Sequence, residues 1–243
     1  SAIISKTGIG AFGRFLKSEL QYHGVLTDYL VMDHRTHTSI IFVSSTTGTP
    51  DFEDFRQGDF LLEPNEVSEE AIERARVVHA STFALSREPC RSAVEKAFRF
   101  ADEAGKIVSL DPNYSLRIWP DHKEAEKVIR KMYRYVDVTK PSEDDARRIF
   151  GRGRSTKPDP EHYVALFHEL GPATVVFTMG EDGVLVSHEG RIQHVPARPV
   201  RVVDVTGAGD SFWAGFMVAL LDGNPPHPGR VFEGHTVQGL LFN

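Results

Sequence analysis

The stretch DVTGAGDSFWAGF, residues 204–216, gathers two aspartates, three glycines and one threonine around the start of an apolar run. Small residues at Gly207, Ala208 and Gly209 let successive backbone N–H groups converge, and a helix start adds positive potential there. Such a loop suits an anion, above all a phosphate whose charge grows during transfer. Asp210, in the first helical turn, is favoured as a carboxylate and can accept a proton. These groups are the minimum equipment for phosphoryl transfer to a hydroxyl.

A purely structural explanation competes with this chemistry. A lone Gly-x-Gly is more often a turn that precedes a capped helix, with Asp210 as the cap. The stretch also lacks the Walker A spacing and its lysine, which excludes a P-loop. No Gly-x-Gly-x-x-Gly lies near the first strand of a βαβ unit, which argues against an NAD-binding oxidoreductase.

The elements that must position this loop alternate between strand and helix. The apolar and periodic patterns predict strands at residues 76–81, 106–113, 136–142, 173–180 and 201–205. They predict helices at residues 10–24, 87–105, 121–135, 142–151, 160–171 and 211–224, and a hairpin-like pair at 183–197. This alternation predicts a mostly parallel sheet covered on both faces. Two further strands, at residues 27–33 and 37–45, fall outside the rhythm and are expected to pair as a small β appendage, followed by a loop at 46–59.

Composition sets the outer limits. The 243 residues are 40% apolar and 26% charged, which is ordinary for a globular chain, and we expect a single domain over residues 1–243. The net charge of −6 argues against nucleic acid or an anionic membrane as partner. No run reaches the roughly 18 apolar residues of a membrane span. With no visible signal peptide and a single cysteine, Cys90, we expect a cytoplasmic protein.

The stretch at residues 204–216 resembles the C-terminal signature of the ribokinase-like, PfkB-type carbohydrate kinases. The resemblance continues in SLDPNYSLRIW at 109–119, TKPSEDDARRIFG at 139–151 and VFTMGEDGVLV at 176–186. It implies a three-layer α/β/α sandwich with a mostly parallel sheet and a small β lid near residues 26–45. In the family pattern a first strand precedes the position of Ser1 and the last helices run further, so the resemblance implies a chain shortened at both ends.

By the same resemblance, Asp210 is the catalytic base, and Gly207, Ala208 and Gly209 form the anion hole. The residues implied to contact ATP are Lys140, Ser142, Thr178, Gly180 and Gly183. Asp145 is implied to hold Mg²⁺ through water, and Asp204 and Thr206 match positions that help bind a monovalent cation such as K⁺. Ser142 and Asp145 stand where the family usually has Asn and Glu, so we expect a rearranged or weaker metal site.

Two arginines are candidate substrate ligands. Arg117 follows the turn at residues 111–113, and the alternative for it is a surface arginine. Arg56 matches an arginine that several ketosugar and ketoacid kinases aim at the substrate, although Asp59 replaces a small residue nearby.

We therefore predict ATP-dependent phosphorylation of a sugar hydroxyl, of the fructokinase or 2-keto-3-deoxygluconate kinase type, with ATP and Mg²⁺ as cofactors. The alternatives are a nucleoside or sugar-phosphate kinase, and a non-catalytic sugar- or nucleotide-binding descendant of the fold. Because an isolated two-stranded ribbon is marginal in water, we also expect a homodimer through the lid.

Overall fold

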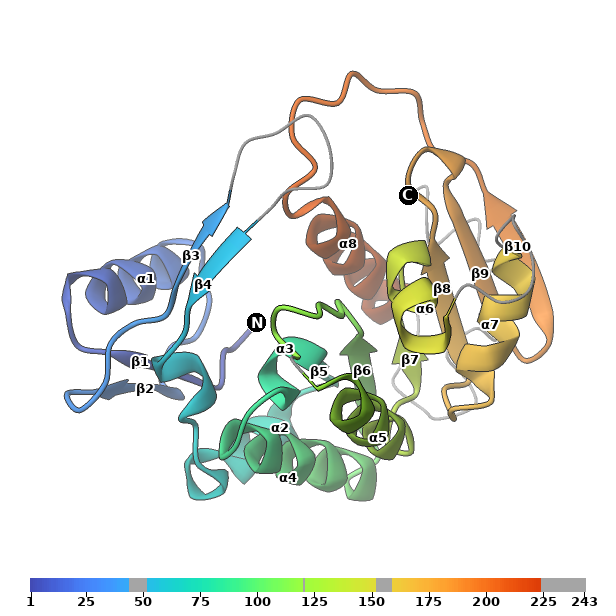
Figure 1. Cartoon of the computed structure of the whole chain (residues 1–243). Coiled ribbons are helices and arrows are strands. Elements are labelled where there is room, and N and C mark those ends of the chain that lie inside the picture. The colour runs from blue at the N-terminus through green and yellow to red at the C-terminus, as the bar shows by residue number, and fades with distance from the viewer. Residues whose placement is uncertain (44–51, 120, 152–158, 224–243) are drawn as a thin grey trace. The chain divides into compact units, whose positions relative to one another are not determined.

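The computed structural model describes residues 1–43, 52–119, 121–151 and 159–223. It divides into two compact units, which we describe separately (Figure 1). The first comprises Ser1–Ala75 with Ala84–Phe100, and the second comprises Arg76–Phe83 with Ala101–Asn243. No described helix is long and apolar enough to cross a membrane.

The first unit begins with a βαβ arrangement. Its elements are β1 (Ser5–Gly8), α1 (Ala11–Tyr22), β2 (Leu30–Asp33), β3 (Ile40–Val43), β4 (Phe52–Phe55), η1 (Gly58–Phe60), η2 (Pro64–Glu66) and α2 (Glu69–Arg74). β1 and β2 pair in parallel, and α1 supplies the crossover that a parallel pair requires. The helices α3 (Thr82–Leu85) and α4 (Cys90–Glu103) include residues of both units.

The predicted pairing of residues 27–33 with 37–45 is wrong. β2 pairs with β1 instead, and β3 forms an antiparallel ribbon with β4. β4 lies inside residues 46–59, which we expected to be a loop because turn-forming residues dominate that stretch. The short pattern FEDF is too brief to stand out from its neighbours, so only the three-dimensional partner reveals it as a strand. The small antiparallel ribbon of this unit is therefore β3 with β4, and the lid expected near residues 26–45 stays a prediction.

The second unit is built on one six-stranded sheet. Its strands are β5 (Val77–Ser81), β6 (Ile107–Asp111), β7 (Val138–Thr139), β8 (Thr174–Thr178), β9 (Val184–His188) and β10 (Arg191–Val195), in the order β10-β9-β8-β7-β6-β5. β5 to β8 run parallel, whereas β9 and β10 form the predicted hairpin at the antiparallel edge. The helices are α5 (His122–Tyr133), α6 (Glu143–Phe150), α7 (Pro160–His168) and α8 (Ala208–Gly223).

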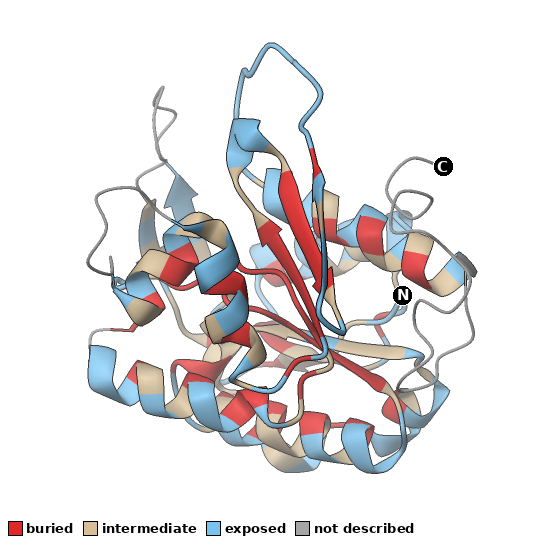
Figure 2. Ribbon diagram, turned by 90° about the vertical axis from the view of Figure 1, so that its right-hand side faces the viewer, coloured by how far each residue is buried: buried red, intermediate tan, exposed pale blue. Residues whose placement is uncertain are grey.

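Helices cover both faces of this sheet, and alternate strand residues show which face each helix covers. On one face α8 packs Trp213, Phe216 and Leu220 into a cluster with Val138 and Val176. On the other face Tyr133 of α5 bonds Thr139 with its hydroxyl, and Tyr163 of α7 stacks on Phe177. The buried central strands stand out in Figure 2. The predicted α/β class with a mostly parallel sheet is confirmed.

The strand predicted at residues 201–205 is wrong. The structure gives no strand there, and Val202, Val203 and Val205 are exposed. A strand needs a hydrogen-bonded neighbour, and within the described residues none pairs with this segment. The apolar pattern predicts a strand, but the segment forms an irregular lead into α8.

Candidate active site

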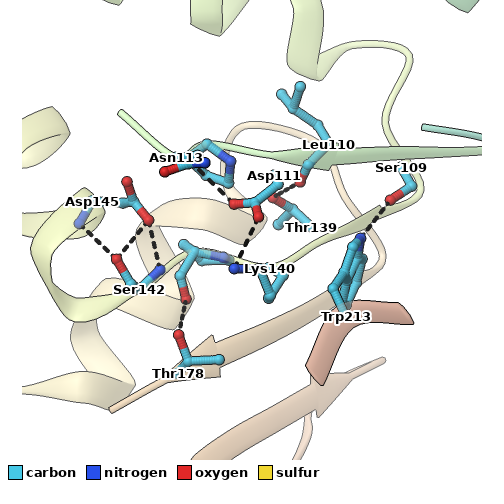
Figure 3. Close-up of polar contacts among 12 residues, drawn as sticks. Ser109, Leu110, Asp111, Asn113, Thr139, Lys140, Ser142, Asp145, Thr178 and Trp213 are labelled. Carbon is cyan, nitrogen blue, oxygen red and sulfur yellow. Dashed lines mark hydrogen bonds and ion pairs between the residues drawn. The ribbon is translucent and has the colours of Figure 1, made fainter. Parts of the chain in front are cut away.

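The carboxyl ends of the parallel strands gather polar side chains at one edge of the sheet. Asp111 ends β6, Lys140 directly follows β7, and Thr178 ends β8. In open α/β sheets this edge is where ligands bind. Figure 3 shows these side chains lying close together beside Ser142 and Asp145.

A buried ion pair lies at the centre of this edge. The Nζ atom of Lys140 is 2.9 Å from Oδ2 of Asp111, and both side chains are buried. Burial raises the pKa of the Asp111 carboxyl to about 6, against the opposing effect of Lys140, and the negative charges of Asp145 and Asp210 add to the rise. At neutral pH the pair is charged and holds the lysine ammonium at a fixed place, where it can meet a phosphate.

The Ser142–Asp145 pair caps helix α6. The Ser142 hydroxyl accepts a hydrogen bond from the Asp145 backbone N–H, and Asp145 accepts from the Ser142 backbone N–H at 2.9 Å and hydroxyl at 2.6 Å. Its other carboxylate oxygen accepts from the Tyr114 backbone N–H at 2.6 Å. This is a capping box, with Asp in the place of the usual Glu.

These contacts bear on the predicted Mg²⁺ site. Both oxygens of Asp145 already accept hydrogen bonds, and the described residues contain no cluster of three metal-binding side chains. Mg²⁺ retains several waters and is commonly held by one or two carboxylates together with substrate phosphates. The donor set therefore fits a hydrated ion held mainly by nucleotide phosphates, with Asp145 in contact through water.

The start of α8 lies against this lysine. A Cβ atom placed on Gly209 would stand 3.1 Å from the Lys140 Nζ atom. Gly207 has a φ of +74°, a conformation that favours glycine, at the turn into the helix. Asp210 is exposed in the first helical turn, beside the N–H groups that a helix start leaves without helical partners. An anion placed here would meet the helix terminus and a lysine together.

Asp204 orders the loop that leads into α8. Its carboxylate accepts a hydrogen bond from the Thr206 backbone N–H at 2.8 Å, and this bonding to Thr206 lowers the pKa of Asp204. Both residues are exposed. The loop therefore carries a stable negative charge, as the predicted monovalent cation site requires.

Of the residues predicted to contact the nucleotide, Thr178 and Gly183 make close backbone contacts within the fold, whereas Gly180 has open space around it. The Thr178 backbone N–H donates to the Pro141 carbonyl at 2.9 Å, which joins the end of β8 to the segment holding Ser142. Gly180 begins η3 (Gly180–Asp182) and Gly183 directly follows it, and both have positive φ values. A Cβ on Gly183 would lie 2.1 Å from the Val195 carbonyl oxygen, so close backbone packing requires this glycine, whereas Gly180 has open space at that position.

Arg56 lies in the first unit and is engaged there. Its guanidinium bonds Asp59 through Nε at 2.8 Å and donates to the Ser86 hydroxyl at 2.7 Å. Ser39 in turn donates its hydroxyl to Asp59. The network joins the residue before β3 to the residue after β4, and it compensates the positive charge of Arg56. Arg117, in the second unit, is exposed.

Three residues of this region were missed by the sequence analysis. Asp111 lies inside the quoted segment 109–119, yet its role as the partner of Lys140 depends on strands that are far apart in sequence. His79 and Ser109 looked like ordinary residues of buried strands. For Ser109 a signal was present, because a buried polar residue in a short apolar strand needs a partner, whereas His79 is exposed and gave no such signal.

Comparison with known proteins assigns the chain to a family of kinases. Residues 1–227 match the pfkB family carbohydrate kinases. The ATP-dependent 6-phosphofructokinase of Thermoanaerobacterium thermosaccharolyticum is 36% identical over 224 residues, which are 92% of this chain and 67% of that protein. The solved fructokinase of Halothermothrix orenii is 38% identical with a TM-score of 0.79, covering 96% of this chain and 79% of that one.

A fructokinase of Vibrio cholerae O395, solved as a double mutant with fructose, ADP and a potassium ion bound, has a TM-score of 0.85 at 26% identity, over 99% of this chain and 75% of that one. The fold and these matches define a carbohydrate kinase of the ribokinase-like class. The chain belongs to the pfkB family of carbohydrate kinases.

Proposed function

We propose that the protein transfers the γ-phosphoryl group of ATP to a hydroxyl of a sugar, with Asp210 as general base. The observation that carries the proposal is the approach of the α8 start to Lys140, beside Gly209. Backbone N–H groups of residues 207–209 and the lysine ammonium stabilise the charge of the transferring group. Asp210 takes the proton of the attacking hydroxyl.

ATP binds, in this proposal, along the edge formed by Lys140, Ser142 and Thr178, with the turn at Gly180 and Gly183 on its outer side. Mg²⁺ is held by the phosphates and by water on Asp145. The negative loop of Asp204 and Thr206 is the candidate place for K⁺, which is bound in the Vibrio cholerae fructokinase.

For the sugar we propose a neutral ketohexose, and fructose is the best candidate. Arg56 is already charge-compensated by Asp59, so a carboxylate or phosphate on the substrate would have to compete with a carboxylate of the protein. This argues against 2-keto-3-deoxygluconate at this place. Two of the solved structures similar to this chain are fructokinases.

A sugar-phosphate kinase is the second candidate. One specific observation favours it, the 36% identity to a 6-phosphofructokinase. Arg117, which is exposed and remote in sequence from Arg56, is the cation we propose for a phosphate in that case.

The test is ADP release by the purified protein with ATP, Mg²⁺ and one acceptor at a time: fructose, 2-keto-3-deoxygluconate, fructose 6-phosphate or a nucleoside. We expect the highest kcat/KM with fructose, by at least about tenfold over the two anionic acceptors. A preference for fructose 6-phosphate would establish the second candidate. No ADP release with any acceptor would contradict catalysis and leave a non-catalytic binding protein.

The Asp59→Ala variant sharpens this test. Removing the carboxylate takes away the negative charge that compensates the buried Arg56 guanidinium, so the ratio of kcat/KM for anionic acceptors to that for fructose should rise several-fold. Glu53→Ala, an exposed acidic residue of β4, is the matched control and should leave the ratio unchanged. An unchanged ratio in both variants would contradict the role proposed for the Arg56–Asp59 pair.

A further inference from the structure

A buried hydroxyl lies on the face of the sheet that α8 covers. Ser109 of β6 is fully buried, and Ile107 and Val138 of the apolar cluster line the same face. The proposed phosphoryl transfer gives Ser109 no task. Because burying a hydroxyl without a partner costs free energy, its contacts indicate what it is for.

Ser109 connects the sheet to α8 through hydrogen bonds. The Nε1 atom of Trp213 lies 3.2 Å from the Ser109 Oγ, and the Nδ1 atom of His79 lies 2.8 Å from the same oxygen. His79 is the register partner of Ser109 on β5. An indole N–H can only donate, and the Trp213 Nε1 atom also lies 3.4 Å from the His79 Nδ1 atom, so its hydrogen is shared between Ser109 and His79. The bonds run from helix to strand to neighbouring strand.

His79 completes the series as a neutral acceptor. His79 is an exposed residue, and desolvation of its ring by the surrounding protein lowers its pKa to about 4, with the nearby Lys140 ammonium adding to this effect. The negative charge of Asp210 opposes the shift. A neutral imidazole can accept the Ser109 hydrogen at Nδ1, whereas an imidazolium could not.

Trp213 lies one turn beyond Asp210 on α8. Its ring is buried and stacks on Phe216, with ring centroids 5.0 Å apart. Apolar packing holds a helix against a sheet but sets its rotation and height loosely, whereas a hydrogen bond is directional. Ser109 and Asp111 are two residues apart on β6 and therefore face the same side. One strand thus holds the first turn of α8 by two routes, through Trp213 and through Lys140 beside Gly209.

We propose that Trp213, through its hydrogen bond to Ser109 and His79, is a positioning residue that fixes the rotation and height of the first turn of α8, and with it the Asp210 carboxylate. The inference rests on the proposed role of Asp210 as the base. Misplacing a reacting group by about 1 Å can cost up to about 100-fold in rate, so the contact has consequences for turnover.

The Trp213→Phe variant tests this role, because it removes the N–H donor and keeps an aromatic ring over Phe216. We expect kcat to fall about tenfold, with KM for sugar and ATP within about twofold. Tyr163→Phe is the matched control. Tyr163 is a buried residue of α7 whose hydroxyl donates to the Gly151 carbonyl at 2.9 Å. Removing this hydroxyl should lower thermal stability without lowering kcat.

Ser109→Ala provides a second route to the same contact. It should lower kcat by no more than Trp213→Phe does, because the Trp213 N–H can still donate to His79, and the double variant Ser109→Ala with Trp213→Phe should lose no more than Trp213→Phe alone. Additive losses, a kcat of Trp213→Phe equal to that of the wild type, or an equal loss in Tyr163→Phe would overturn the positioning role.

A spectroscopic readout is independent of activity. The chain has two tryptophans, and Trp119 donates its indole N–H to the Thr82 carbonyl at 3.2 Å. In ¹⁵N-labelled protein, Ser109→Ala should move the Trp213 indole signal and leave that of Trp119 in place; no movement of the Trp213 signal would contradict the contact. Asp210→Asn separates the two proposals. If it keeps full turnover, the base assignment fails, whereas if only Trp213→Phe is without effect, the positioning role alone fails.

Discussion

The two polar regions of the second unit use their carboxylates in opposite ways. At the strand edge, Asp111 is paired with Lys140, and Asp145 accepts three hydrogen bonds from Ser142 and Tyr114. At the start of α8, Asp210 is exposed. The first region is buried and its groups are committed to one another, whereas the second keeps its carboxylate accessible.

This contrast teaches how a phosphoryl-transfer site is divided between binding and reaction. Groups that only provide an electrostatic field work best when the fold fixes them in advance, because no reorganisation is then needed during the reaction. A base must reach a substrate that comes and goes, so it lies on the open side. The point where the two regions meet is the contact between Lys140 and Gly209.

The largest effect is expected from a side chain placed at Gly209, between the buried region and the exposed one. Gly209→Val adds a branched side chain 3.1 Å from the Lys140 Nζ atom, where the backbone must also approach the phosphate. We expect kcat to fall at least about 100-fold, comparable with the loss of an oxyanion-hole donor. Gly215→Val, in the same helix with open space around it, is the control and should keep near-normal turnover. Equal kinetics in the two variants would show that the loop is only a turn.

A smaller fall in kcat is expected when Asp111, the buried partner of Lys140, loses its charge. The pKa of Asp111 is raised to about 6, so the carboxylate that holds Lys140 forms only above that pH. Turnover should therefore fall as the pH drops below about 6, and Asp111→Asn should lower kcat by about tenfold at neutral pH and remove this part of the pH profile.

The free energy of unfolding is expected to depend on pH in the opposite direction to turnover. A raised carboxyl pKa means that the folded state binds more protons than the unfolded state between about pH 4 and 6, so the contribution of Asp111 to the free energy of unfolding decreases as the pH rises through that window. Denaturant titrations of the wild type and Asp111→Asn across these pH values measure the difference. A wild-type pH profile that Asp111→Asn leaves unaltered would separate Asp111 from catalysis.

The smallest effect concerns the β3–β4 ribbon, which we propose as the lid and the dimer contact. Ile41, Phe42 and Phe55 are exposed on it, and an isolated ribbon with such a surface needs a partner. Ile41→Glu should yield monomers and raise KM for the sugar several-fold more than KM for ATP, whereas Ile41→Thr, which keeps the strand preference, should change less. Light scattering that finds a monomeric wild type at micromolar concentration would contradict the dimer.

The sequence predicted the second unit far better than the first. From β5 to β10, apolar strands alternate with helices of clear periodicity, which leaves one interpretation, and each predicted element was found near its predicted place. In the first unit the strands are four residues long, and which strands pair is set by a crossover helix and by contacts distant in sequence. Pattern alone cannot specify a partner strand.

The candidate site was predictable where a motif is continuous in the chain. The loop at residues 204–210 can be proposed from sequence alone, because its residue types stand in consecutive positions, and its role in the site stays a prediction. The pairing of Asp111 with Lys140, and of Ser109 with Trp213, joins residues on different elements, so no spacing in the sequence indicates it. Such contacts follow from strand order, which only the fold provides.

The most direct measurement of the central claim is the comparison of wild type with Asp210→Asn. Asparagine keeps the size and much of the hydrogen bonding of aspartate but cannot accept the proton. General-base catalysis is worth about 10²–10⁴-fold, so kcat for sugar-dependent ADP release should fall at least about 100-fold, while the Kd for ATP, measured by calorimetry, stays within about twofold. An Asp210→Asn protein with near-normal turnover would contradict the account.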